Sequence, residues 1–107
     1  MAEFLVQPDI ERDIERDEQT EETEENKWKV IIHNDEVTPF DFVIAILIRI
    51  FNLTPVIAEY ITYSAHTNGI ALVAVLPKTE AERKVGKAHF AARLEGYPLT
   101  FTIEPDE

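Results

Sequence analysis

The chain reads Asn34-Asp35-Glu36-Val37-Thr38-Pro39 at the point where a predicted strand gives way to a predicted helix. The apolar run before it, residues 28–33, is typical of a buried strand, and Asn and Asp end strands by bonding to their own backbone. Thr38 can cap the following helix with Pro39 at the first helical position, where no backbone donor is needed. The stretch therefore places a carboxylate and an amide where a strand meets a helix.

Two predicted helices follow this turn. Residues 39–51 carry apolar side chains at spacings of three and four, which predicts an amphipathic helix that stops near Asn52. Thr54-Pro55 repeats the signal of a cap followed by proline, so a second helix is expected from Pro55 to about Ala65. Gly69 suits a left-handed exit from that helix.

The rest of the chain predicts a strand, a helix and a strand. The apolar run 70–76 predicts a strand buried on both faces or nearly so. Thr79 and Glu82 have the spacing of a capping box for a third helix, which Gly96 ends. Alternation in residues 99–103 predicts a strand with one face covered and one face wet.

The predicted order is therefore β-α-α-β-α-β. The helical hairpin can return the second strand antiparallel to the first, and the single crossover helix makes the third strand parallel to the second. Both outer strands then pair with the first strand in the middle. We expect an α+β fold, a three-stranded antiparallel sheet with three helices packed on one face.

Charge divides the chain into two parts. Residues 1–25 contain 11 acidic and 2 basic side chains, whereas residues 26–107 contain 10 acidic and 8 basic ones. We expect residues 1–26 to form a disordered acidic extension and residues 27–107 to form one domain. Nucleic acid is not an expected partner, because its binders need a basic surface.

Several other classes are excluded or disfavoured by composition. The chain has no cysteine, so disulfides and thiolate chemistry are absent. The N-terminus lacks the pattern of a signal peptide, and residues 44–50 are too short to span a bilayer. We expect an intracellular, cytoplasmic protein without a membrane partner.

Three polar residues are candidates for a binding site. Asn34 and Asp35 end the first strand and His66 ends the second helix, so these two ends can meet as a corner rich in hydrogen-bond acceptors. Such a corner would suit a substrate ammonium. A neutral imidazole receives an ammonium best, so binding should weaken at acidic pH. Nearby residues would line an apolar hollow, or form plain core: Ile32, Phe40, Val43, Thr62, Ala65 and Leu99.

Two other chemistries remain open from the residues alone. Asp35 and His66 could activate the hydroxyl of Thr38 or Ser64 in a hydrolase, although no glycine-rich oxyanion loop is present. Metal binding by His33, Asp35 and His66 is conceivable, but no compact ligand motif occurs. We expect neither a metal nor a cofactor. His89 is interpreted as a surface or packing residue.

From about Lys27 to Glu104 the chain resembles ClpS, the adaptor of bacterial and organellar Clp proteases that recognises N-degrons. The resemblance is carried by four pieces in this order: Trp28-Lys29-Val30 leading to residues 34–43, His66 followed by Gly69, residues 81–85, and Pro98-Leu99. Together they cover the expected folded part without an obvious gap. The resemblance implies three antiparallel strands, three helices and no catalytic activity.

The resemblance also implies roles for individual residues. Asn34, Asp35 and His66 would hold the α-amino group of a substrate whose first residue is Leu, Phe, Tyr or Trp. The first side chain would enter a pocket formed by Ile32, Thr38, Phe40, Val43, Thr62, Ala65 and Leu99. Glu82 and Lys84 would contact the N-terminal domain of a ClpA- or ClpC-type unfoldase, with the adaptor as a monomer. The acidic extension would help to hand over the substrate.

Departures from the family pattern define alternatives. Phe40 and Thr62 replace a common Met, Ala65 replaces a common Val, and Thr79 stands where Glu is frequent. A ClpS-like paralogue with altered peptide specificity is therefore one alternative. A module resembling the C-terminal domain of the ribosomal stalk protein is another, because its elements follow a similar order.

Overall fold

The computed structural model describes residues 26–107, so the acidic extension predicted for residues 1–26 lies outside the described part except for Asn26. Strand β2 (Lys27–His33) precedes helices α2 (Phe40–Arg49) and α3 (Pro55–Asn68). Strand β3 (Ile70–Pro77), helix α4 (Lys78–Leu94) and strand β4 (Thr100–Pro105) follow. The predicted order of elements is confirmed.

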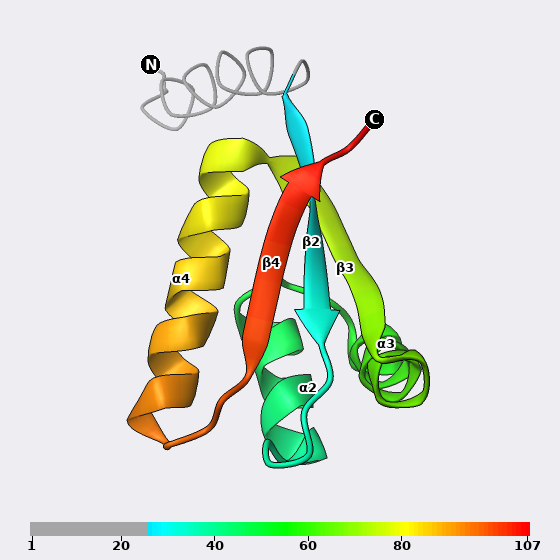
Figure 1. Ribbon diagram of the computed structural model, residues 1–107, viewed down its shortest axis with the longest axis vertical. Coiled ribbons are helices and arrows are strands. Elements are labelled where there is room, and N and C mark those ends of the chain that lie inside the picture. Colours follow the sequence, from blue (N-terminus) through cyan, green and yellow to red (C-terminus); the bar gives the residue numbers. More distant parts are fainter. Residues whose placement is uncertain (1–25) are drawn as a thin grey trace, which may run out of the picture.

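One three-stranded sheet has the order β3-β2-β4 (Figure 1). Strand β2 pairs antiparallel with both neighbours, so that Val30 lies opposite Ala74 on one side and Ile103 on the other. The prediction of a central first strand is confirmed. Because β2 ends between its two neighbours, the turn that follows it is held by the whole sheet.

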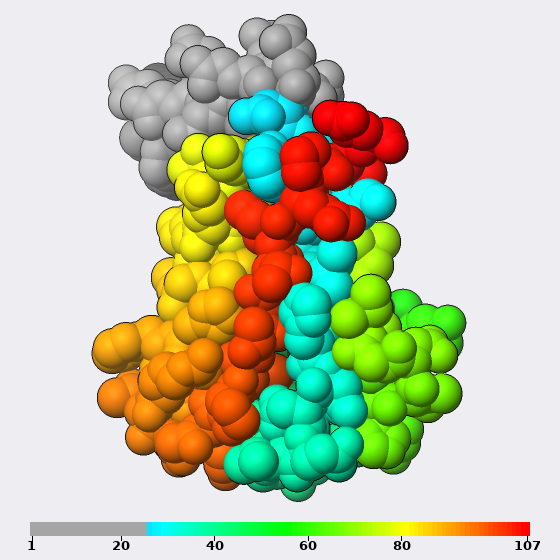
Figure 2. All heavy atoms as spheres, viewed as in Figure 1, coloured from blue at the N-terminus to red at the C-terminus, as the bar shows by residue number. Residues whose placement is uncertain are grey.

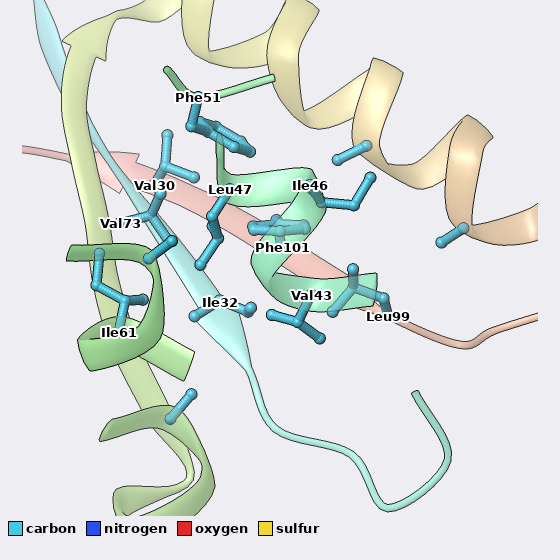
Figure 3. Packing of buried hydrophobic residues seen from close by; sticks show 14 of the residues in the cluster. Val30, Ile32, Val43, Ile46, Leu47, Phe51, Ile61, Val73, Leu99 and Phe101 are labelled. Atoms are coloured by element: carbon cyan, nitrogen blue, oxygen red, sulfur yellow. The ribbon is translucent and has the colours of Figure 1, made fainter. Parts of the chain in front are cut away.

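The core lies between one face of the sheet and the helices. Val30 and Ile32 of β2 are 0% and 2% exposed, and they pack with Leu47 of α2 and Phe101 of β4 (Figure 3). The opposite face of the sheet carries exposed side chains and is turned to the viewer in Figure 2. At one end of the core, the turn after β2 lies beside Val43 (Figure 3).

Strand β3 differs from the prediction of burial on both faces. Ile70 and Leu72 are each 51% exposed, and only Val73 is buried. β3 is an edge strand, and its outward face meets solvent because the helices cover one side only. A register shift between Val30 and Ile31 leaves Val73 without a partner on β2, and Val73 is 6% exposed.

Two predicted helix caps are wrong. The N-cap of α2 is Pro39, without a side-chain hydrogen bond, so Thr38 lies one residue before the cap, where its hydroxyl donates to the Asp35 carboxylate. Helix α4 begins at Lys78 with Pro77 as its N-cap, so Thr79 lies inside the helix and forms no capping box with Glu82. In this second case β3 passes into the helix without a loop.

The start of α3 agrees with the sequence. The Thr54 side chain accepts a hydrogen bond from the backbone N–H of Ile57, and Pro55 occupies the first turn. The helix runs to Asn68, three residues beyond the predicted end, and Gly69 leaves it at a φ of 91°. None of the helices in the described part of the chain is long and apolar enough to cross a membrane.

Candidate functional site

The Asp35 carboxylate organises the turn between β2 and α2. One oxygen accepts hydrogen bonds from the backbone N–H groups of Val37, at 2.8 Å, and Thr38, at 2.6 Å. The other oxygen accepts from the Thr38 hydroxyl at 2.9 Å. A carboxylate has about four lone-pair directions, so one acceptor direction remains for a ligand. The turn thus holds the Asp35 carboxylate in place and still leaves it able to accept one more hydrogen bond.

A second hydrogen bond brings the end of α3 to this turn. The backbone N–H of Asn34 donates to the Gly69 carbonyl at 2.9 Å, and Gly69 in turn donates to Ala65 at 2.7 Å. His66 lies beside Ala65 and is exposed. The predicted meeting of the strand end with the helix end is therefore present in the structure. The Asn34 side-chain amide bonds to no other residue within 26–107, which leaves it open to a ligand.

The residues predicted to form a pocket surround one hollow. Its lining contains Asn34, Asp35 and all seven predicted apolar positions: Ile32, Thr38, Phe40, Val43, Thr62, Ala65 and Leu99. His33 completes the lining. The structure therefore brings these residues together, and places His66 just outside, with its ring centroid 5.2 Å from that of Phe40.

The hollow is apolar although two threonines line it. The Thr62 hydroxyl donates to the Ala58 carbonyl of its own helix at 2.8 Å, and the Thr38 hydroxyl is bound to Asp35. Both side chains are buried, at 3% and 7% exposure, so their polar atoms need no further partner. The remaining polar lining residues are consecutive in the sequence, His33, Asn34 and Asp35, so the polar groups gather at one corner.

The hollow is also small. Its free volume is about 20 Å³, room for about one water molecule. A benzene-sized group occupies an apolar cavity of about 150 Å³. Phe40 contacts two side chains of α3 edge-to-face. Its ring centroid lies 5.1 Å from that of Tyr63 and 5.2 Å from that of His66. A large side chain can enter only if the lining, and above all this half-exposed ring, moves.

Sequence reasoning missed Tyr63, and it considered His33 as a possible metal ligand but not as part of the hollow. Tyr63 follows Thr62 and precedes His66 by three residues, so helical spacing could have placed it at the mouth of the hollow. His33 offered no such signal, because its position depends on the pairing of β2 with β4. Its Nε2 lies 2.8 Å from the Thr102 hydroxyl on that neighbouring strand.

The two residues expected to contact an unfoldase differ in exposure. Glu82 on α4 is exposed. The Lys84 side chain is 9% exposed, and its ammonium donates to the Ile50 carbonyl at 3.0 Å and pairs with Glu80 at 3.6 Å. Lys84 therefore ties α4 to the end of α2, and little of its surface reaches solvent.

The geometry does not form a nucleophile and base pair. The Thr38 hydroxyl donates to Asp35, and within residues 26–107 no hydrogen bond joins His66 to Thr38 or Ser64. In the same range, no three His, Asp or Glu side chains gather closely enough to hold a metal ion. The chemistry that remains is a charged, acceptor-rich corner beside an apolar hollow.

Comparison with known proteins identifies the class of protein to which this chain is similar. The profile of a family described as "ATP-dependent Clp protease adaptor protein ClpS" matches residues 23–102. The Clp protease adapter ClpS of Nitratidesulfovibrio vulgaris is 40% identical over 97 residues, covering 91% of this chain and 97% of that protein. The ClpS of Clostridium acetobutylicum is 43% identical over 76 residues, which cover 71% of this chain and 75% of that protein.

A solved structure agrees with these relatives. Agrobacterium tumefaciens ClpS2, bound to L-phenylalaninamide, superposes with a TM-score of 0.73 at 33% identity, covering 76% of this chain and 98% of that one. The matches define a class of adaptor proteins that serve ATP-dependent Clp proteases. This chain belongs to the ClpS family.

Proposed function

We propose that this protein is a non-enzymatic adaptor that binds substrates through a bulky apolar N-terminal residue and delivers them to a Clp unfoldase. The observation that carries the proposal is one hollow with apolar walls and charged or polar acceptors at one corner. A new N-terminus is the peptide position that presents an ammonium beside its side chain. An internal Leu would leave the corner without a partner, which costs binding energy.

The α-amino group is assigned to Asn34, Asp35 and His66. Asp35 supplies the negative charge and one remaining acceptor direction, while the Asn34 amide oxygen can accept a second hydrogen bond. His66 is one helical turn from Thr62 and stands at the mouth, where a neutral ring nitrogen can accept the third. Phenylalaninamide, the ligand of the Agrobacterium neighbour, carries the same two groups, an α-amine and an apolar side chain.

The side chain of the first residue enters the hollow lined by Ile32, Thr38, Phe40, Val43, Thr62, Ala65 and Leu99. Because the volume is about 20 Å³, entry requires Phe40 to rotate away from Tyr63 and His66. Phe is stiffer than the Met common at this position, and Ala65 leaves more room than Val. We infer that the ranking of Leu, Phe, Tyr and Trp differs from that of family members with Met at this position.

Delivery is assigned to the other end of the molecule. The exposed face around Glu82, with the small exposed part of Lys84, is proposed to bind the N-terminal domain of a ClpA- or ClpC-type unfoldase. The adaptor acts as a cytoplasmic monomer, and residues 1–26 assist in handing over the substrate. α4 presents this face at its first turns, away from the turn after β2 (Figure 1).

Fluorescence anisotropy with matched peptides tests the proposal. The peptides begin with Leu, Phe, Tyr, Trp, Arg or acetyl-Leu and are otherwise identical. Tight binding is expected for the four apolar N-termini alone. Acetylation removes the positive charge and should weaken binding by about 2–5 kcal/mol, since the corner would be left unpaired. Equal affinity for Leu and acetyl-Leu peptides would rule out recognition of the amine.

A further inference from the structure

A second hollow lies between α2 and α3 and is separate from the first-residue site. It has a volume of about 460 Å³ and is lined by Asp41, Ile44, Ala45, Ile48, Arg49 and Glu59. This size falls in the range of about 300–1,000 Å³ found for ligand sites. We call it the α2–α3 groove.

The groove has an apolar floor and a charged rim. Ile44, Ala45 and Ile48 are half-buried, whereas the rim residues Asp41 and Glu59 are exposed. On α3, Val56 and Tyr63 lie three residues before and four after Glu59, hence on the same helix face, and are 74% and 57% exposed. The apolar floor suits an apolar side chain of an extended peptide, and the charged rim suits the polar backbone of that peptide.

The groove begins beside the first-residue site. Phe40 lines that site, and Ile44 follows it by one helical turn on the same face of α2. Across the gap, Tyr63 contacts Phe40 with ring centroids 5.1 Å apart, and Glu59 lies one turn further from the mouth. The groove therefore runs along α2 and α3, starting at the mouth of the first-residue site. Phe40 also contacts His66, which stands one turn beyond Tyr63 on α3 and is assigned to the amine.

We propose, resting on the function proposed above, that the α2–α3 groove binds the segment of a substrate that follows its first residue. Successive floor positions lie about 6 Å apart along α2, and an extended peptide advances about 3.3 Å per residue. Ile44 and Ile48 are thus reached by about the third to fifth substrate residues. An apolar side chain there is bound by the floor, so the adaptor selects substrates by more than their first residue.

Two eight-residue peptides test the proposal by anisotropy. Both begin with Leu, and they carry either Ile or Ser at positions four and five. The Ile peptide should bind roughly fivefold to tenfold more tightly, because apolar surface is buried. Ala45→Arg fills the groove and should reduce this difference to less than about twofold, because the apolar floor is no longer accessible to the Ile side chains. Gly86→Arg adds the same charge on α4, where no atom lies within 4 Å of an added Cβ, and should keep the difference.

Each result has a defined meaning. Equal affinity of the two peptides for the unaltered protein, or a difference that survives Ala45→Arg, overturns the proposal. If Ala45→Arg instead weakens unfoldase binding alone, the groove is a protease-docking surface and the proposal is wrong. A tripeptide amide beginning with Leu separates the two proposals: its binding supports the first-residue site alone, and its failure to bind overturns both.

A photo-crosslinking measurement on the unaltered protein does not depend on how a variant folds. A benzoylphenylalanine is placed at position four of the Leu peptide, and the crosslinked residues are mapped by mass spectrometry. Crosslinks to residues 41–49 or 56–63 are expected. Crosslinks confined to α4 or to the uncovered face of the sheet would overturn the proposal.

Discussion

Helices α3 and α4 use their polar side chains in opposite ways. On α4, Lys84 bonds to the Ile50 carbonyl, and Arg93 bonds to the carbonyls of Tyr97 and Leu99. His89 accepts a hydrogen bond from the backbone N–H of Phe101. On α3, Tyr63 and His66 stand exposed around Phe40. The helix whose polar groups are satisfied is part of the scaffold, and the helix that presents them outward borders the site.

The two histidines illustrate the same difference. His89 accepts a hydrogen bond from the backbone N–H of Phe101 through Nε2, a contact that only the neutral ring can make. His66 is exposed and contacts the ring of Phe40, and no hydrogen bond joins its nitrogens to another residue within 26–107. Substitutions around the site at α3 should therefore change mainly peptide binding, whereas substitutions of the bonded residues on α4 should change mainly the free energy of unfolding.

The largest expected effect is on peptide binding in Asp35→Ala. Losing the charge that we propose faces the ammonium should weaken binding of a Leu peptide by about 2–5 kcal/mol, or roughly thirtyfold or more. Folding stability should also fall by about 1–3 kcal/mol, because two backbone N–H groups of the turn lose their acceptor.

Glu36→Ala is the matched control for this variant. It removes the same charge from the adjacent, exposed position. Anisotropy should show near-normal binding for Glu36→Ala at the same ionic strength. Similar losses in both variants would mean that net charge, and not the Asp35 corner, governs affinity.

The next largest effect is on stability in Lys84→Ala. This variant loses a hydrogen bond from a charged donor and the packing of a buried stem, so the free energy of unfolding should fall by about 1–3 kcal/mol. Lys87→Ala, on the exposed side of α4, should change it by less than about 0.5 kcal/mol. Urea unfolding measures both, and equal midpoints for the two variants would contradict the scaffold role of α4.

A smaller effect is expected on the ranking of substrates in Phe40→Met. The flexible Met should move from the mouth more easily than a ring held between Tyr63 and His66. Binding of the Trp peptide should improve relative to the Leu peptide by roughly threefold to tenfold. An unchanged order of Leu, Phe, Tyr and Trp peptides would remove Phe40 from the determinants of specificity.

The smallest effect is on the pH dependence of stability. Burial, and secondarily the nearby Arg93 guanidinium, lowers the pKa of His89 below the ordinary value of 6.5. The unfolded chain therefore takes up a proton on that residue before the folded chain does. This contribution to stability is fully present above about pH 6.5 and is lost as the pH falls from there through the lowered pKa.

His89→Gln isolates this contribution, because Gln keeps an acceptor for the Phe101 N–H and does not titrate. Thermal unfolding from pH 5 to pH 8 should show a shallower loss of stability at acidic pH in the variant. Parallel curves for the two proteins would show that His89 does not titrate differently in the folded state.

Local sequence signals predicted the elements and much of the site. Thr54-Pro55 started a helix where expected, and the apolar and polar patterns predicted all three strands. They failed where a competing partner was close in space. Thr38 was expected to cap α2, yet the Asp35 carboxylate holds its N–H and hydroxyl in the turn, and the N-cap of α2 is the next residue, Pro39. Burial of β3 was overestimated because an apolar run cannot reveal that it lies at an edge.

The sequence by itself determined the order of elements, the concentration of acidic residues in positions 1–25 and most of the residues that line the hollow. Periodicity and turn chemistry are local properties, so they can be read along the chain. Only the tertiary structure decided that the hollow has a free volume of about 20 Å³, that Tyr63 and His66 border Phe40, and that Lys84 points inward. These features depend on contacts between residues distant in the sequence, and the volume left between packed side chains is a property of all of them together.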